Sequence, residues 1–202
     1  GEGCGNTMRP DRPRHRRHHA GSPARRLSRP AVVMPASLQL RLKKGSDGRV
    51  ASFALHRDDG TFTVMRNPNP FFPIHDLTHY AVENTLRHKR GFYGLVCEGW
   101  NFEDFGTPWP RGRLPADMDP AEFLVGMFDL ERATGHPMTL RDVNEQLVAY
   151  AAAHPAAPAL PLTQRELDRI RERVLGYSAR WKALPPGETL VLGYVPGEDS
   201  GA

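Results

Sequence analysis

Residues 38–42, 50–56 and 62–66 alternate apolar and polar side chains, and two short turns, Gly45–Gly48 and Asp58–Gly60, separate them. A period of two turns one face of each segment inward, which predicts half-buried strands. Turns this short join strands that are neighbours in a sheet. We therefore expect an antiparallel meander of three strands, and this pattern constrains the fold more than any other feature of the chain.

After residue 70 the chain takes on the spacing of helices, until residues 189–194 alternate again and predict a last strand that joins the sheet. The helices are expected at residues 73–87, 92–100, 120–135, 139–154 and 163–184, with a long loop at 101–119. The predicted fold class is α+β: a small antiparallel sheet, made of the meander and the C-terminal strand, packed against four or five helices. One domain, residues 37–195, would hold all of it, and residues 196–202 would form a flexible C-terminus.

Residues 1–36 differ from the rest in composition. They contain eight Arg, no Lys and only two acidic residues, among many Pro, His, Gly and Ser. Such a segment cannot bury enough apolar surface to order itself, so we expect a disordered tail, or a cloning remnant ahead of Met34. The remainder of the chain is close to neutral. A fold that binds nucleic acid would carry its basic surface on the domain itself, so we expect nucleic acid to make at most non-specific contacts with the tail.

The chain has no apolar run of the roughly 18–20 residues that a membrane span requires. Its two cysteines, Cys4 and Cys97, lie in unrelated contexts and form neither a disulfide framework nor a zinc knuckle. These features predict a cytoplasmic protein without a membrane partner.

The residues best suited to chemistry are His75, His79 and Glu83, which recur every fourth position. On a helix this spacing places both imidazoles on one side, where two of them can hold one divalent metal ion. A third ligand must come from a neighbouring element, because the three residues extend over about 12 Å of helix axis. Asp76 would lie in the first helical turn, where it could cap the helix or orient a ligand.

Glu98 is the best candidate for the third ligand, because a carboxylate is out of place at the end of an apolar segment unless it is exposed or employed. Glu83, Glu131 and Asp129 are the next candidates. Glu98 or Glu83 would be the third ligand or the general base. Imidazole and carboxylate ligands suit zinc or iron, and we expect zinc before iron.

A structural interpretation of the same helix stays open. In it, His75 caps the helix, His79 bonds to a loop carbonyl, and Glu83 pairs with Arg87 four residues along. The aromatic residues around the long loop allow two interpretations as well, a lid over an apolar pocket or ordinary packing. These residues are Tyr93, Trp100, Phe102, Phe105 and Trp109.

Two resemblances bear on these motifs. Residues 71–83, with the run Phe-Phe-Pro-Ile-His-Asp-Leu-Thr-His-Tyr-Ala-Val-Glu, and residues 91–100, with Gly-Phe-Tyr-Gly-Leu-Val-Cys-Glu-Gly-Trp, resemble a family of bacterial hypothetical proteins, which implies a shared fold and no known activity. The HDxxH motif also resembles that of the coenzyme Q biosynthesis scaffold family, whose two histidines, aspartate and later glutamate form a zinc site. The matching residues are His75, Asp76 and His79, and the position of the later glutamate is Gly91.

Two functions from different classes follow. The first is a metal-binding protein. In its most specific form, this is a metal-dependent hydrolase or lyase that acts on a small molecule through His75, His79 and a carboxylate. The second is a non-catalytic interaction module with a purely structural HDxxH helix, in which the aromatic loop contacts a protein partner.

Overall fold

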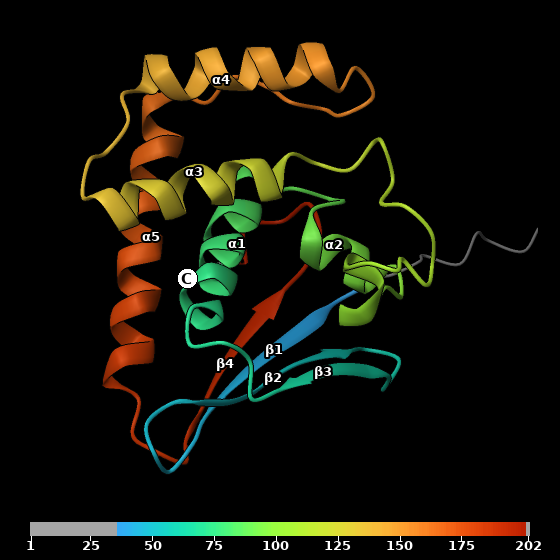
Figure 1. The fold of residues 1–202 in the computed structure, drawn as a ribbon, viewed down its shortest axis with the longest axis vertical. Helices are drawn as coiled ribbons and strands as arrows, with labels where there is room; N and C mark the ends of the chain where they lie inside the picture. The colour runs from blue at the N-terminus through green and yellow to red at the C-terminus, as the bar shows by residue number, and fades with distance from the viewer. Residues whose placement is uncertain (1–35, 201–202) are drawn as a thin grey trace, which may run out of the picture. The chain divides into compact units, whose positions relative to one another are not determined.

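The computed structural model describes residues 36–200. The predicted tail lies outside these residues. The elements follow in the order β1 (Leu38–Lys44), β2 (Val50–Arg57), β3 (Phe62–Arg66), α1 (Phe72–Leu86), α2 (Phe92–Cys97), the 3-10 helix η1 (Phe102–Phe105), α3 (Ala121–Thr134), α4 (Leu140–Ala153), α5 (Gln164–Ala183) and β4 (Thr189–Tyr194) (Figure 1).

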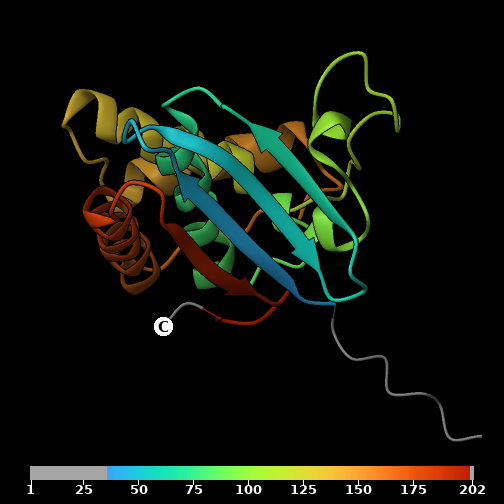
Figure 2. The same ribbon diagram turned by 90° about the horizontal axis from the view of Figure 1, so that it is seen from below.

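The four strands form one antiparallel sheet in the order β3-β2-β1-β4. Leu40 in β1 is opposite Leu55 of β2 and Leu192 of β4. These leucines are buried, so the alternation seen in the sequence turns one face of all three strands toward the helices. The helices lie on that side of the sheet, and none of the described helices covers the other face (Figure 2). The α+β prediction, including the meander and the added C-terminal strand, is confirmed.

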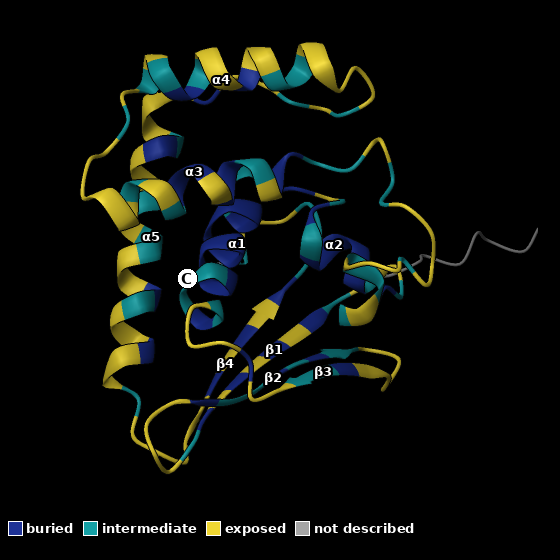
Figure 3. Ribbon diagram, in the orientation of Figure 1, coloured by how far each residue is buried: buried dark blue, intermediate teal, exposed yellow. Residues whose placement is uncertain are grey.

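Two hydrophobic clusters hold the domain together. The first joins the inner face of the sheet to α1, α2 and α5, and the second joins α3, α4 and α5 to the opposite side of α1. Helix α1 therefore lies between them, and every residue from Asp76 to Asn84 is buried (Figure 3). Because burial of an unpaired polar group is costly, the polar residues of α1 need partners inside the fold.

The start of α1 differs from the expectation. The helix begins at Phe72, with Phe71 as N-cap and Pro73 in the first turn, so it starts one or two residues early. Asp76 consequently lies beyond the first turn and does not cap the helix. Proline fits here because the first helical positions leave the backbone N–H without a helical partner.

Residues 199 and 200 contact the helices α5 and α1. Asp199 bonds to Arg169 and Arg173 of α5, and the Ser200 N–H donates to the Asn84 side chain of α1. Fixed partners thus extend to residue 200, and the flexibility expected from residue 196 stays a prediction. Within the described residues, no helix is both long and apolar enough to cross a membrane.

Candidate functional site

His75 and His79 lie one turn apart on α1, with ring centroids 4.9 Å from each other. The Nδ1 atom of His75 is 2.7 Å from Oδ2 of Asp129 on α3. The Nδ1 atom of His79 is 3.3 Å from Oε1 of Glu83. Each imidazole thus has a carboxylate on its Nδ1 side. Such a partner fixes the orientation of the ring, so that Nε2 is the atom that can act as a ligand.

A third carboxylate lies on the other side of His79. Oε2 of Glu122, in the first turn of α3, is 3.0 Å from His79 Nε2. Ligand atoms of His75, His79 and Glu122 all lie within 4.8 Å of one another, and we call these residues the metal group. Ligands of a tetrahedral zinc ion are about 3.3 Å apart, given bonds of about 2.0–2.1 Å. The Glu122 side chain is 72% exposed, so it is free to make this short approach.

Opposing effects act on the charge of His79. Its burial disfavours the charge, but hydrogen bonds to Glu122 and Glu83 outweigh that effect and raise the pKa of His79 to about 10. The hydrogen bond from His79 in turn lowers the pKa of Glu122. A metal ion that binds to His79 must therefore displace a proton.

Asp76 is the fourth polar residue at this point. It is 7% exposed and lines the same cavity as the two histidines. Its carboxylate makes no hydrogen bond to any residue that the structure describes. Burial raises the pKa of Asp76 to about 7, and the nearby histidines offset this only in part. A buried carboxyl group that faces a cavity without a partner is available to a ligand.

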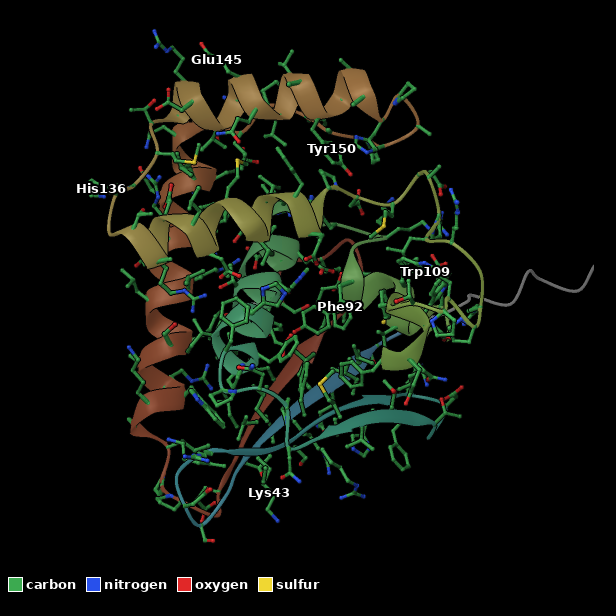
Figure 4. All side chains as sticks on the ribbon, in the orientation of Figure 1. Lys43, Phe92, Trp109, His136, Glu145 and Tyr150 are labelled. Atoms are coloured by element: carbon green, nitrogen blue, oxygen red, sulfur yellow. The ribbon has the colours of Figure 1, made fainter. Side chains whose placement is uncertain are left out.

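The metal group opens into a cavity of about 430 Å³, within the range of small-molecule sites. Its four titratable residues come from α1 and α3, and the rest of its lining is apolar. The lining residues are Met65, Phe72, His75, Asp76, His79, Phe92, Phe102, Phe105, Trp109, Leu114, Met118 and Glu122. Figure 4 labels Phe92 and Trp109 on the side of α1 that faces α2 and the loop after it. Of the five aromatic residues around the long loop, Phe102, Phe105 and Trp109 line this cavity and favour the lid, whereas Tyr93 and Trp100 are buried in the fold as ordinary packing.

Glu98 does not join the metal group among the described residues, and this corrects the leading candidate for the third ligand. Its two carboxylate oxygens accept hydrogen bonds from Arg90, at 2.7 and 3.1 Å. Arg90 also pairs with Asp117 in the loop before α3. The carboxylate at the end of the apolar segment is therefore employed, but in anchoring a loop.

Glu83 is close to the site and still does not reach the cavity. It is fully buried behind His79, and its carboxylate also accepts hydrogen bonds from the Tyr93 N–H and the Tyr194 hydroxyl. A Cβ atom at Gly91 would lie 2.5 Å from this carboxylate, so the carboxylate fills the space that a side chain at 91 would need. Glu83 orients His79, and it is not placed as a general base.

Asp129 and Glu131, the remaining candidates for the third ligand, also have partners of different kinds. Asp129 holds His75, whereas Glu131 accepts two hydrogen bonds from Arg171 and one from the Met138 N–H. The contacts of the structural interpretation are absent from the described residues: the histidines bond to carboxylates, and Arg87 is the left-handed C-cap of α1.

Sequence reasoning missed Glu122, which lies 43 residues after His79. The available signal was its place in Pro120-Ala-Glu, at the start of a predicted helix. An acidic residue there is ordinary, because it complements the helix dipole. Only the packing of α3 across α1 distinguishes Glu122 from other first-turn carboxylates.

Comparisons of the chain with protein-family models, with curated proteins and with solved structures gave no match. The function is therefore inferred from the geometry of the site.

Proposed function

We propose that this chain is a metal-dependent enzyme, a hydrolase or lyase, that acts on a small molecule. His75, His79 and Glu122 would hold one divalent ion at the mouth of the apolar cavity. The observation that carries this proposal is the approach of two imidazoles and one carboxylate to within 4.8 Å of one another.

The charges around the two rings support a cation. The carboxylates of Asp76, Glu83, Glu122 and Asp129 surround the two imidazoles. Asp129 is also paired with Arg132, at 2.6 Å, and Glu122 is largely exposed. The buried acidic groups left beside the rings are Asp76 and Glu83, and a divalent ion would add positive charge next to them.

Zinc fits the ligand set better than harder ions do. Two imidazoles and one carboxylate form a common set for catalytic zinc, with a further position left for water or substrate. The same ligands also serve iron, whereas magnesium and calcium prefer oxygen ligands throughout. We therefore propose zinc, with iron as the alternative ion.

A divalent ion here would polarise an oxygen of the bound ligand or of water, which is the step that hydrolases and lyases share. The residues of the chain would do the rest. Asp129 and Glu83 hold the two imidazoles in position, and the apolar lining excludes water. Asp76 would face the ligand with a carboxyl group that makes no hydrogen bond to another described residue.

Metal analysis of protein purified without a histidine tag tests the proposal. We expect about one equivalent of zinc or iron in the wild type and a loss of at least tenfold in affinity in Glu122→Gln, which keeps the shape of the side chain. His136→Ala is the matched control, because His136 is exposed and lies at the far end of α3 (Figure 4). Equal metal content in all three proteins, or none in any, would refute the proposal and leave the helix structural.

A further inference from the structure

We infer that the ligand of this cavity is a compact, uncharged molecule with an aromatic or alicyclic body and one oxygen at the end that meets the metal group. The inference rests on the proposed function for the role of that oxygen only. The shape and chemistry of the body follow from the cavity itself.

An aromatic wall begins directly at the metal group. We use this name for Phe92, Phe102, Phe105 and Trp109, all of which line the cavity. The ring centroid of Phe92 is 5.4 Å from that of His79 and 4.6 Å from that of Phe105. Phe102 is 6.1 Å from Phe92. Rings at these separations form a continuous apolar surface on which a ring of the ligand can pack.

Trp109 stands in the cavity at a conformational cost. Its φ angle is +60°, in the left-handed region that bulky residues rarely occupy. Hydrogen bonds hold this turn, from the Trp109 N–H to the Gly106 carbonyl and from the Gly112 N–H to the Trp109 carbonyl, both 2.8 Å long. Backbone strain of this kind persists where surrounding contacts impose it, and it is common at ligand sites. The indole is therefore placed to contact the ligand.

The loop that carries Trp109 is tied at two points. Arg90 connects Glu98, at the end of α2, to Asp117, near the end of the loop. The Arg111 guanidinium lies 4.9 Å from the ring centroid of Trp100. These contacts hold the loop that carries Trp109, and they give both Arg90 and Arg111 partners outside the aromatic wall.

The wall offers nothing to an anion. Among the described residues that line the cavity there is no Lys or Arg. A phosphate, sulfate or carboxylate on the body of the ligand would lose its hydration without gaining a cationic partner. The polar groups of the lining come from one place, the α1 residues beside Glu122. A ligand with one polar end and an uncharged body matches this distribution.

Two probes of one shape test the inference. They are 2-naphthol, and naphthalene-2,6-dicarboxylate, which carries a carboxylate at each end of the same body. Calorimetric titrations are made on the metal-free and on the zinc-loaded full chain. We expect 2-naphthol to bind to both forms, more tightly to the zinc-loaded one. We expect naphthalene-2,6-dicarboxylate to bind at least about tenfold more weakly, because in either orientation one carboxylate would enter the aromatic wall.

Variants of the wall locate the binding. Trp109→Ala and Phe105→Leu should each lower the affinity for 2-naphthol by about two- to tenfold, which is the range that one aromatic contact contributes. Phe62→Ala is the matched control, because Phe62 is an exposed aromatic residue of β3 outside the cavity lining, and it should change neither affinity.

The outcomes separate the two proposals. If zinc does not bind but metal-free protein selects 2-naphthol through Trp109, the proposed function fails and the assignment of the ligand body stands. Equal binding of both probes, or no effect of Trp109→Ala and Phe105→Leu, would overturn the inference whether or not zinc binds. Zinc that binds without tightening 2-naphthol would overturn the placement of the ligand oxygen.

Discussion

Glu83 and Glu122 bind the same imidazole from opposite sides, and their isosteric variants should therefore behave in opposite ways. Glu83 is fully buried, and its carboxylate serves His79, the Tyr93 N–H and the Tyr194 hydroxyl. Glu122 is 72% exposed, and its carboxylate bonds to His79 alone among the described residues. Glu83→Gln should damage the fold, whereas Glu122→Gln should damage metal binding.

The magnitudes follow from burial. Removal of one partner from a buried ion pair costs about 3–5 kcal/mol, because the other charge stays buried. Loss of an exposed partner costs about 0–1 kcal/mol. With a urea m-value of about 2 kcal/mol per M, Glu83→Gln should lower the unfolding midpoint by about 1.5–2.5 M and Glu122→Gln by less than about 0.5 M.

The assay is urea unfolding of metal-free protein at pH 7, monitored by circular dichroism. The same samples are then titrated with zinc against a chromophoric chelator. Similar midpoints for the two variants would show that Glu83 does not compensate a buried charge. A Glu122→Gln protein that retains full zinc affinity would show that this carboxylate is not a ligand.

Three further predictions concern the surroundings of the site. Asp129→Asn should lower zinc affinity by about 10–100-fold, because the imidazole it orients loses its charged partner; the chelator titration checks this, with Glu131→Gln as a control on the same helix. Asp76→Asn should raise the free energy of unfolding of metal-free protein at pH 7, by an amount on the order of a few kcal/mol, and leave it nearly unchanged at pH 4; urea unfolding at both values measures it. Lys44→Met should destabilise the protein by about 2–4 kcal/mol without changing zinc affinity, because the buried Nζ donates to three carbonyls at the end of α5.

The sign of the Asp76 prediction follows from the direction of its shift. Burial raises the pKa of Asp76 from 3.8 to about 7, so the folded state binds a proton that the unfolded state releases. The stability that comes from this proton is complete below about pH 4 and is lost as the pH rises through 7. Asparagine stays neutral at every pH. A variant no more stable than the wild type at pH 7 would contradict the buried position of the carboxyl group.

Much of the fold was predictable because its signals are local. The alternation of Leu38, Leu40 and Leu42 requires only a pleated strand with one buried face, and β1 has that pattern. Thr163 and Glu166 cap α5 through side chains three residues apart. The period of two near residue 190 predicted a strand, and this strand, β4, pairs with β1 in the sheet.

The site was predictable only where its residues share one helix. The spacing of His75 and His79 places both imidazoles on one side of α1 in any fold that keeps this helix. Their carboxylate partners on α3, Asp129 and Glu122, come from 54 and 43 residues further along the chain. No periodicity links such positions, because the packing of α3 across α1 depends on the hydrophobic surfaces of both helices.

Glu98 illustrates the same limit from the other side. The sequence by itself determined that a carboxylate ends an apolar helix, and that it needed a purpose. Only the tertiary structure decided which purpose, since Arg90 lies within reach of that carboxylate and the two imidazoles do not. Secondary structure depends on interactions between residues that are close in the sequence. The partner of a charged side chain depends on which distant segment the folded core places beside it.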